Sequence, residues 1–218
     1  MCFSATASFT AAGVIGAIGI VTLTRARNPR ELPLAATPLL FALQQATEGL
    51  LWLQLPLAPE GAISTGLTLV YLLFSNVFWP VYVPLAVFLI EPGAGRRRLM
   101  AAGLAAGTCV AAYLLWAILA LPHGALIRGG HIIYVTQTRQ DILVAAGYIA
   151  AVSLPLLASS QRTVVMLGAI VFAGCAVAYA FYWEGFVSVW CFFAAGASGV
   201  IVFHFEKQRR GQLHAARI

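Results

Sequence analysis

The sequence predicts an all-α protein, built as a single bundle of seven transmembrane helices. Of its 218 residues, 61% are apolar and only 9% are charged, whereas a soluble domain carries about 25% charged residues. A soluble chain of this length could not bury so much apolar surface, and disordered chains are poor in apolar residues. The apolar residues also fall in long runs between prolines and charged residues, as in polytopic membrane proteins.

Seven of these runs are long enough to cross a bilayer as helices, which requires roughly 20 apolar residues. They are apolar on every side, whereas the strands of a membrane barrel alternate. The runs end at helix-breaking or charged residues, such as Asn28-Pro29, Pro56, Glu91-Pro92 and Pro122. The predicted spans are residues 6–24, 33–55, 62–90, 99–121, 141–159, 163–183 and 186–205.

Two domains of unequal size follow from these spans. Residues 1–206 form the transmembrane domain, and residues 207–218 form a basic cytoplasmic tail. The first span is expected to stay in the protein, because no basic segment precedes it as in a cleavable signal peptide.

Lysine and arginine residues are distributed unevenly between the two sides of the predicted bundle. One side has only Arg128 and Arg139, and the other carries the remaining eleven: Arg25, Arg27, Arg30, Arg96, Arg97, Arg98, Arg162, Lys207, Arg209, Arg210 and Arg217. The basic side faces the cytoplasm in membrane proteins. We therefore expect the N-terminus outside and the C-terminus inside, in a bacterial inner membrane. Contact with anionic lipids explains the net charge of +6. Binding of nucleic acid is not favoured, because no basic domain is predicted outside the bilayer.

An internal repeat is a further hypothesis. Glu48-Gly49 in the second span and Glu184-Gly185 after the sixth recur 136 positions apart. This offset also overlays the first span on the fifth, which gives a 3+1+3 arrangement with the fourth span as linker. The alternative is coincidence, because the bilayer fixes the length of every spanning helix.

Polar and ionisable side chains within the spans define the candidate site, because they are costly at membrane depth. Six of them are predicted to bind a ligand near the outer leaflet: Gln44, Gln45, Glu48, Asn76, Tyr182 and Glu184. A divalent metal ion is a second hypothesis, with Cys2, Glu48, His131 and Glu184 as ligands. The two carboxylates could instead share a proton, or cap helices where water still reaches them.

The segment of residues 122–140 is the longest connection. Gly129-Gly130 provides the positive φ angles that a two-residue turn needs, between two runs rich in β-forming residues. A hairpin is therefore expected on the outer face, either as a lid carrying Arg128 and His131 or as a plain connector. Five aromatic residues are interpreted as interface anchors: Trp52, Trp79, Trp116, Trp183 and Trp190.

Small residues and prolines indicate how the helices pack. Glycine stripes allow close approach of helices in lipid, either inside the bundle or in a homo-oligomer. They are Gly13, Gly16 and Gly19, then Gly103 and Gly107, then Gly196 and Gly199. Pro80 and Pro84, close to Ser75 and Asn76, predict a kinked and movable helix in the third span.

The opening residues Met1-Cys2-Phe3-Ser4-Ala5 resemble the start of an uncharacterised bacterial membrane-protein family. This resemblance implies no established activity. The 3+1+3 plan is similar to that of SWEET-like and PQ-loop transporters, although no Pro-Gln dipeptide is present. Seven-helix zinc hydrolases of the alkaline ceramidase and adiponectin-receptor type need three histidines near Ser and Asp, a pattern that this chain lacks.

These observations favour a protein that binds a metal ion or small polar solute at an outward-facing site, for transport or sensing. Two other classes stay open. One is a membrane-embedded enzyme, metal- or thiol-dependent, that uses Cys2, Glu48 and His131. The other is an accessory subunit of a membrane complex. A retinal protein is excluded, because the only lysine, Lys207, lies at the cytoplasmic end.

Overall fold

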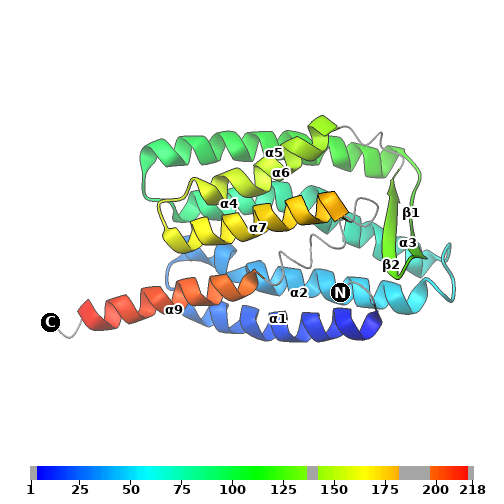
Figure 1. The fold of residues 1–218 in the computed structure, drawn as a ribbon, viewed down its shortest axis with the longest axis horizontal. Helices are drawn as coiled ribbons and strands as arrows, with labels where there is room; N and C mark the ends of the chain where they lie inside the picture. Colours follow the sequence, from blue (N-terminus) through cyan, green and yellow to red (C-terminus); the bar gives the residue numbers. More distant parts are fainter. Residues whose placement is uncertain (1–3, 137–141, 182–196, 216–218) are drawn as a thin grey trace.

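The computed structural model describes residues 4–136, 142–181 and 197–215. In these residues a bundle of helices is joined at one end by a two-stranded hairpin (Figure 1). In chain order the elements are α1 Ala5–Arg25, η1 Pro29–Glu31, α2 Leu32–Gln54, α3 Ala62–Leu72, η2 Leu73–Phe78, α4 Trp79–Ile90, α5 Ala94–Ala120, β1 His123–Arg128, β2 His131–Thr136, α6 Ile142–Leu157, α7 Arg162–Phe181 and α9 Ser198–Ala215.

The helices follow the predicted spans closely up to residue 181. The third predicted span is one continuous helical stretch, Ala62–Ile90, in which α3, η2 and α4 succeed one another. The seventh differs. Its first part lies outside the described residues, and α9 continues to Ala215, through the boundary expected at residue 206. The Lys, Gln, Arg and Ala residues of this stretch are good helix formers, so charge alone does not end the helix there.

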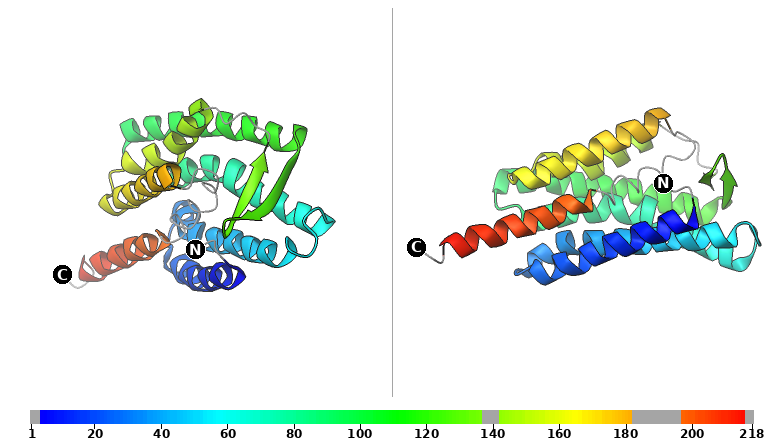
Figure 2. Two further views of the ribbon diagram at one scale, coloured as in Figure 1. Left: turned by 45° about the vertical axis from the view of Figure 1, so that its right-hand side comes forward. Right: turned by 60° about the horizontal axis from the view of Figure 1, so that its bottom comes forward.

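The first two helices pack closely as an antiparallel pair (Figure 2). Gly19 lies against the backbone of Leu39, where an added Cβ would be 2.6 Å from the Leu39 nitrogen. Gly16 meets Ala42. At the other end the ring of Phe9 lies 2.9 Å from the Cβ position of Gly49. Gly16 and Gly19 of the predicted stripe therefore serve packing within the chain, whereas a Cβ at Gly13 would meet no atom within 4 Å. The homo-oligomer stays a prediction.

The third predicted span contains a π-helix, η2, shortly before Pro80, the first of the two prolines that predicted a kink. In η2 the backbone N–H of Trp79 donates to the carbonyl of Phe74, five residues earlier. Pro84 has no N–H, so the carbonyl of Pro80 has no partner four residues along. That carbonyl lies against Gly107 of α5, where an added Cβ would be only 1.9 Å away. Gly107 therefore lets α5 approach the irregular part of the third span.

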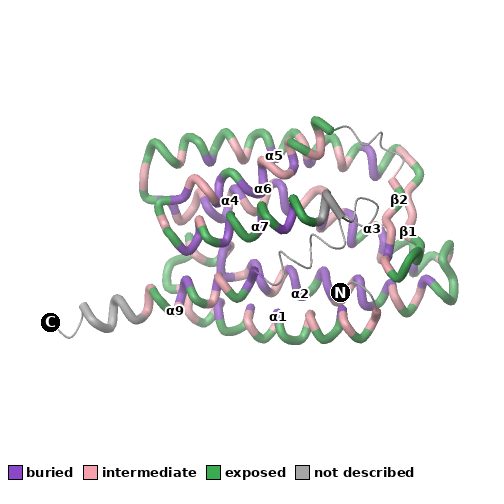
Figure 3. The backbone as a smooth tube through the Cα atoms, viewed as in Figure 1, coloured by how far each residue is buried: buried purple, intermediate pink, exposed green. Residues whose placement is uncertain are grey.

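The surface of the bundle is typical of a membrane protein. Three helical stretches are long and apolar enough to cross a bilayer, Ala5–Arg25, Ala62–Ile90 and Ala94–Ala120, and Ile142–Leu157 and Arg162–Val177 are shorter apolar helices. Large apolar side chains such as those of Val14, Leu43 and Trp116 are exposed, while several polar side chains are fully buried (Figure 3). This is the reverse of a soluble protein. The number of spans and their orientation stay predictions.

The two ends of the bundle differ in charge. Figure 1 shows the α1–α2, α4–α5 and α6–α7 connections at one end, together with the C-terminal end of α9. Among the described residues, these segments carry the arginines and the lysine expected on the cytoplasmic side, and Arg217 lies outside the described ranges. The α2–α3 connection and the hairpin lie at the opposite end.

Candidate binding site on helix α2

One face of α2 carries three buried polar side chains. Gln44 and Glu48 are 0% exposed and Gln45 is 1% exposed. They share a helical face because residues three and four apart are neighbours. On the other side of the helix Leu43 and Leu50 are 52% and 43% exposed. The helix thus turns its polar face inward and its apolar face outward.

Gln44 is held by Trp79, the first residue of α4. The indole N–H of Trp79 donates to Oε1 of Gln44 at 2.6 Å. The ring of Phe41 stacks on the indole with centroids 3.9 Å apart. Trp79 is completely buried, so the interpretation of this residue as an interface anchor is wrong. Its polar N–H is placed in the core because a buried amide accepts it.

Gln45 is different from its neighbour. Among the described residues, neither the oxygen nor the nitrogen of its side-chain amide has a hydrogen-bond partner. The hydroxyl of Ser8 on α1 is also buried without one. A buried polar group left unsatisfied costs about 1–3 kcal/mol, and such groups in native proteins call for an explanation, such as a bound molecule.

Glu48 places a carboxyl group on the same buried face. It follows Gln44 by one turn and precedes Gly49, against which the ring of Phe9 packs. Ionisable groups within a membrane are rare and commonly functional. With the two amides, this carboxyl group gives α2 a set of hydrogen-bond acceptors and donors on one buried face.

Asn76, the fourth predicted ligand, lies on η2 and is only half-buried. Its Oδ1 is 3.4 Å from the hydroxyl of Ser75, and the backbone carbonyl of Ser75 accepts from the hydroxyl of Tyr148 on α6. The π-helix thus joins α6 to Trp79, three residues further along. Such π-bulges are frequent at functional sites, and a shared ligand between Asn76 and the α2 cluster stays a prediction.

The predicted hairpin is confirmed. Gly129 and Gly130 form its turn with φ of +58° and +77°, and the strands pair from His123 with Thr136 to Arg128 with His131. Ile132 of β2 is fully buried in a cluster with Leu51 of α2, Leu55 directly after α2 and Tyr71 of α3.

Contacts with the bundle show which part of the hairpin covers α2. The ring of Tyr134 stacks on that of Tyr71, with centroids 4.2 Å apart and an interplanar angle of 2°. The hairpin therefore lies over α2 one turn beyond Glu48. His131 is at its turn, where burial lowers its pKa. The role of the hairpin as a lid stays a prediction.

Several predicted site residues fall outside the described part of the chain: Cys2, Tyr182 and Glu184. The meeting of Glu48 with Glu184, and the metal site of Cys2, Glu48, His131 and Glu184, therefore stay predictions. Within the described ranges no group of three or more His, Cys, Asp or Glu residues is arranged to hold a metal ion.

A second buried carboxylate was not predicted as a site. Glu91, directly after α4, accepts hydrogen bonds from the backbone N–H and hydroxyl of Ser160 at 2.9 and 3.1 Å and from the hydroxyl of Ser159 at 3.2 Å. Burial would raise the pKa of Glu91, but these bonds and one from the Gly93 N–H outweigh it and lower the pKa. This clasp joins the α4–α5 and α6–α7 connections. In the sequence analysis, Glu91 served only as a boundary between predicted spans, and no local pattern linked it to the segment of Ser160.

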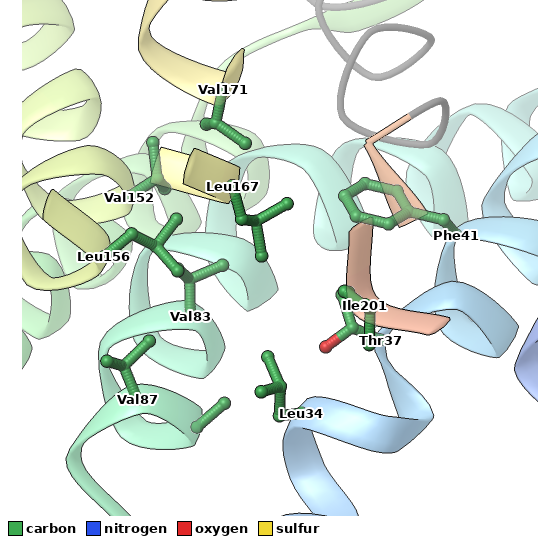
Figure 4. A pocket seen from close by; sticks show the side chains of 11 residues that line it. Leu34, Thr37, Phe41, Val83, Val87, Val152, Leu156, Leu167, Val171 and Ile201 are labelled. Atoms are coloured by element: carbon green, nitrogen blue, oxygen red, sulfur yellow. The ribbon is translucent and has the colours of Figure 1, made fainter. Parts of the chain in front are cut away.

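A small cavity between α2, α4, α6, α7 and α9 has a different character (Figure 4). It has a volume of about 30 Å³ and is lined by side chains such as Leu34, Val87 and Leu156. Its one polar lining residue, Thr37, donates its hydroxyl to the carbonyl of Pro33. Room for one water molecule without free polar groups does not make a solute site.

The fold and the α2 cluster define a helical bundle of membrane-protein type with a buried polar site. The chain belongs to a family of unknown function, DUF6629, whose model matches residues 1–217. The resemblance of the opening residues to an uncharacterised family is thus confirmed. No curated protein and no solved structure matches the chain.

Proposed function

We propose that this protein binds a small polar solute at the buried polar face of α2, within a bacterial inner membrane, for transport or sensing. The observation that supports it is the side-chain amide of Gln45, buried and without a partner among the described residues. Gln44 is already oriented by Trp79. A bound solute would satisfy the amide and offset its desolvation.

The groups on α2 favour a solute that both donates and accepts hydrogen bonds. The Gln45 amide offers one acceptor and two N–H donors, and the Glu48 carboxyl group accepts when ionised. An ammonium or hydroxyl group would suit Glu48, and a carbonyl or carboxylate would suit the Gln45 amide. Zwitterionic amino acids and polyols are therefore the first classes to test. A transition metal is less favoured, because no cluster of three suitable ligands occurs in the described residues.

Binding can be tested on the full chain purified in detergent. Thermal unfolding is measured with glycine, alanine, glycerol, glucose and Mg²⁺ as separate probes, since a ligand that binds the folded state raises Tm. We expect a Tm increase with a zwitterion or polyol, which Glu48→Gln and Gln45→Leu abolish. The matched controls are Glu60→Gln, on the exposed α2–α3 connection, and Gln54→Leu, at the end of α2. Absence of any shift in the unmodified protein, or an equal shift in Glu48→Gln, contradicts the proposal.

A further inference from the structure

A second polar hollow lies at the basic end of the bundle, away from the α2 cluster. It is open, has a volume of about 500 Å³ and is bounded by η1, the start of α7 and the middle of α9. Arg162 and Lys207 are the two cationic residues that line it, and Glu31 is its acidic residue.

The positive charges in this hollow are not neutralised within the described residues. The ion pairs there join Arg25 and Arg209 to Glu206, at 3.1 and 3.8 Å, and involve neither Arg162 nor Lys207. The neighbouring acid, Glu206, is thus already shared by two arginines. The two lining cations remain available to an external anion.

The carboxylate of Glu31 is also committed elsewhere. Its Oε2 accepts from the backbone N–H groups of Arg27 and Asn28, at 3.0 and 3.3 Å, in a capping box that begins η1. The carboxylate therefore faces the turn before η1, and its charge only partly offsets the two cations.

The buried wall of the hollow is polar and neutral. The side-chain nitrogen of Gln208 lies 3.2 Å from Nε2 of His204, and because an amide nitrogen only donates, Nε2 accepts. The proton of the neutral ring is then on Nδ1, which donates to the hydroxyl of Thr163. His204 and Thr163 are both buried. This wall fixes α9 against the start of α7, and so holds Lys207 near Arg162.

We propose that this hollow binds a phosphate group, with Arg162 and Lys207 as its charged ligands. The guanidinium fork of arginine matches two phosphate oxygens, and lysine adds a point charge. Figure 1 shows that α7 begins at the end of the bundle that carries the basic connections. On the cytoplasmic surface of a bilayer, basic pockets between helices receive the headgroups of anionic lipids. The same chemistry would hold a free phosphate or a phosphorylated solute.

The test uses the full chain in a zwitterionic detergent and isothermal titration calorimetry. The probes are water-soluble dioctanoyl phosphatidylglycerol, inorganic phosphate, and dioctanoyl phosphatidylcholine as the zwitterionic control. The variant Arg162→Gln/Lys207→Gln removes both ligands. Arg96→Gln/Arg98→Gln is its matched control, since it removes two exposed charges at the start of α5, at the same end of the bundle and outside the hollow.

We expect one anionic probe to bind the unmodified protein, with a Kd weakened about tenfold or more in Arg162→Gln/Lys207→Gln and unchanged in the control variant. Tighter binding of the lipid than of inorganic phosphate identifies a headgroup, and the reverse identifies a soluble phosphate compound. Two results overturn the proposal. One is no binding of either anionic probe. The other is equal weakening in both double variants, which would show diffuse attraction by the basic end.

Discussion

The indole N–H of Trp79 donates to the side-chain oxygen of Gln44, 35 residues earlier, and Phe41 stacks on the same indole. This contact fixes α2 against the start of α4, directly after the π-helix. It gives Gln44 an assigned partner, whereas the adjacent amide of Gln45 has none among the described residues. We therefore assign a structural role to Gln44 and a binding role to Gln45.

The effects of removing the two partners of this hydrogen bond are expected to be non-additive. Trp79→Phe leaves the Gln44 oxygen without its donor, and Gln44→Leu leaves the indole N–H without its acceptor, each at a cost of about 1 kcal/mol or more. The double variant removes both polar groups, so its loss should be smaller than the sum of the two single losses. Reversible unfolding in detergent measures the three values. Strictly additive losses would show that the pair is not energetically coupled.

Gly107→Ala is expected to disrupt the contact between α4 and α5. Its Cβ would lie 1.9 Å from the carbonyl oxygen of Pro80, so the helices must separate, at a cost of about 1–3 kcal/mol. Gly66→Ala is the matched control, because a Cβ on this exposed glycine of α3 meets no atom within 4 Å, and alanine favours helix. The variants are compared by Tm. A Tm for Gly107→Ala at or above that of Gly66→Ala would refute the close approach.

The Glu91 clasp predicts a dependence of stability on pH. The folded protein holds the pKa of Glu91 below its ordinary value of 4.5, so the unfolded chain binds a proton more readily. The stabilisation is therefore complete above pH 4.5 and is lost as the pH falls through the lower folded pKa. Glu91→Gln lacks this carboxylate. Its Tm deficit should be largest near neutral pH and shrink in acid, and a deficit that is constant with pH would contradict the assignment.

The turn of the hairpin depends on glycine. Gly130 has φ of +77°, a conformation that costs a branched residue about 1–2 kcal/mol. Gly130→Val should therefore loosen the hairpin and speed hydrogen exchange at the amides of His131 and Ile133, which lie in the hydrogen-bonded pairs next to the turn. Gly124→Val, in β1, is the control, because its Cβ meets nothing within 4 Å and valine favours strands. Similar exchange in the two variants would argue against this turn.

The composition, and the prolines and charged residues that end the apolar runs, predicted most of the helices. Spans followed from apolar runs, and the hairpin followed from Gly129-Gly130, because these features act locally. The end of α9 was not predictable in this way, since its polar continuation is helical by propensity and hydropathy does not detect it. Gln44, Gln45 and Glu48 were singled out by the cost of polar groups in lipid, and their role in binding stays a prediction.

Contacts between distant segments were beyond the sequence. Trp79 was interpreted as an anchor, because a tryptophan near a span gives no sign of the acceptor that its N–H will meet on another helix. Glu91 lay at a boundary, and its partners Ser159 and Ser160 lay at another boundary 68 residues or more away. Pairing of this kind depends on how the helices pack in space, and local sequence patterns do not show which distant residues come into contact.

The central claim is that the polar face of α2 receives a solute from the aqueous phase. Its most direct test is thiol labelling of Gln45→Cys, in a chain whose Cys2, Cys109 and Cys191 are replaced by serine and whose buried Cys175 is retained as the unreactive reference. The account predicts that a membrane-impermeant maleimide, added from the hairpin side of proteoliposomes, labels the introduced thiol faster than it labels Cys175. Labelling no faster than that of Cys175 would contradict it.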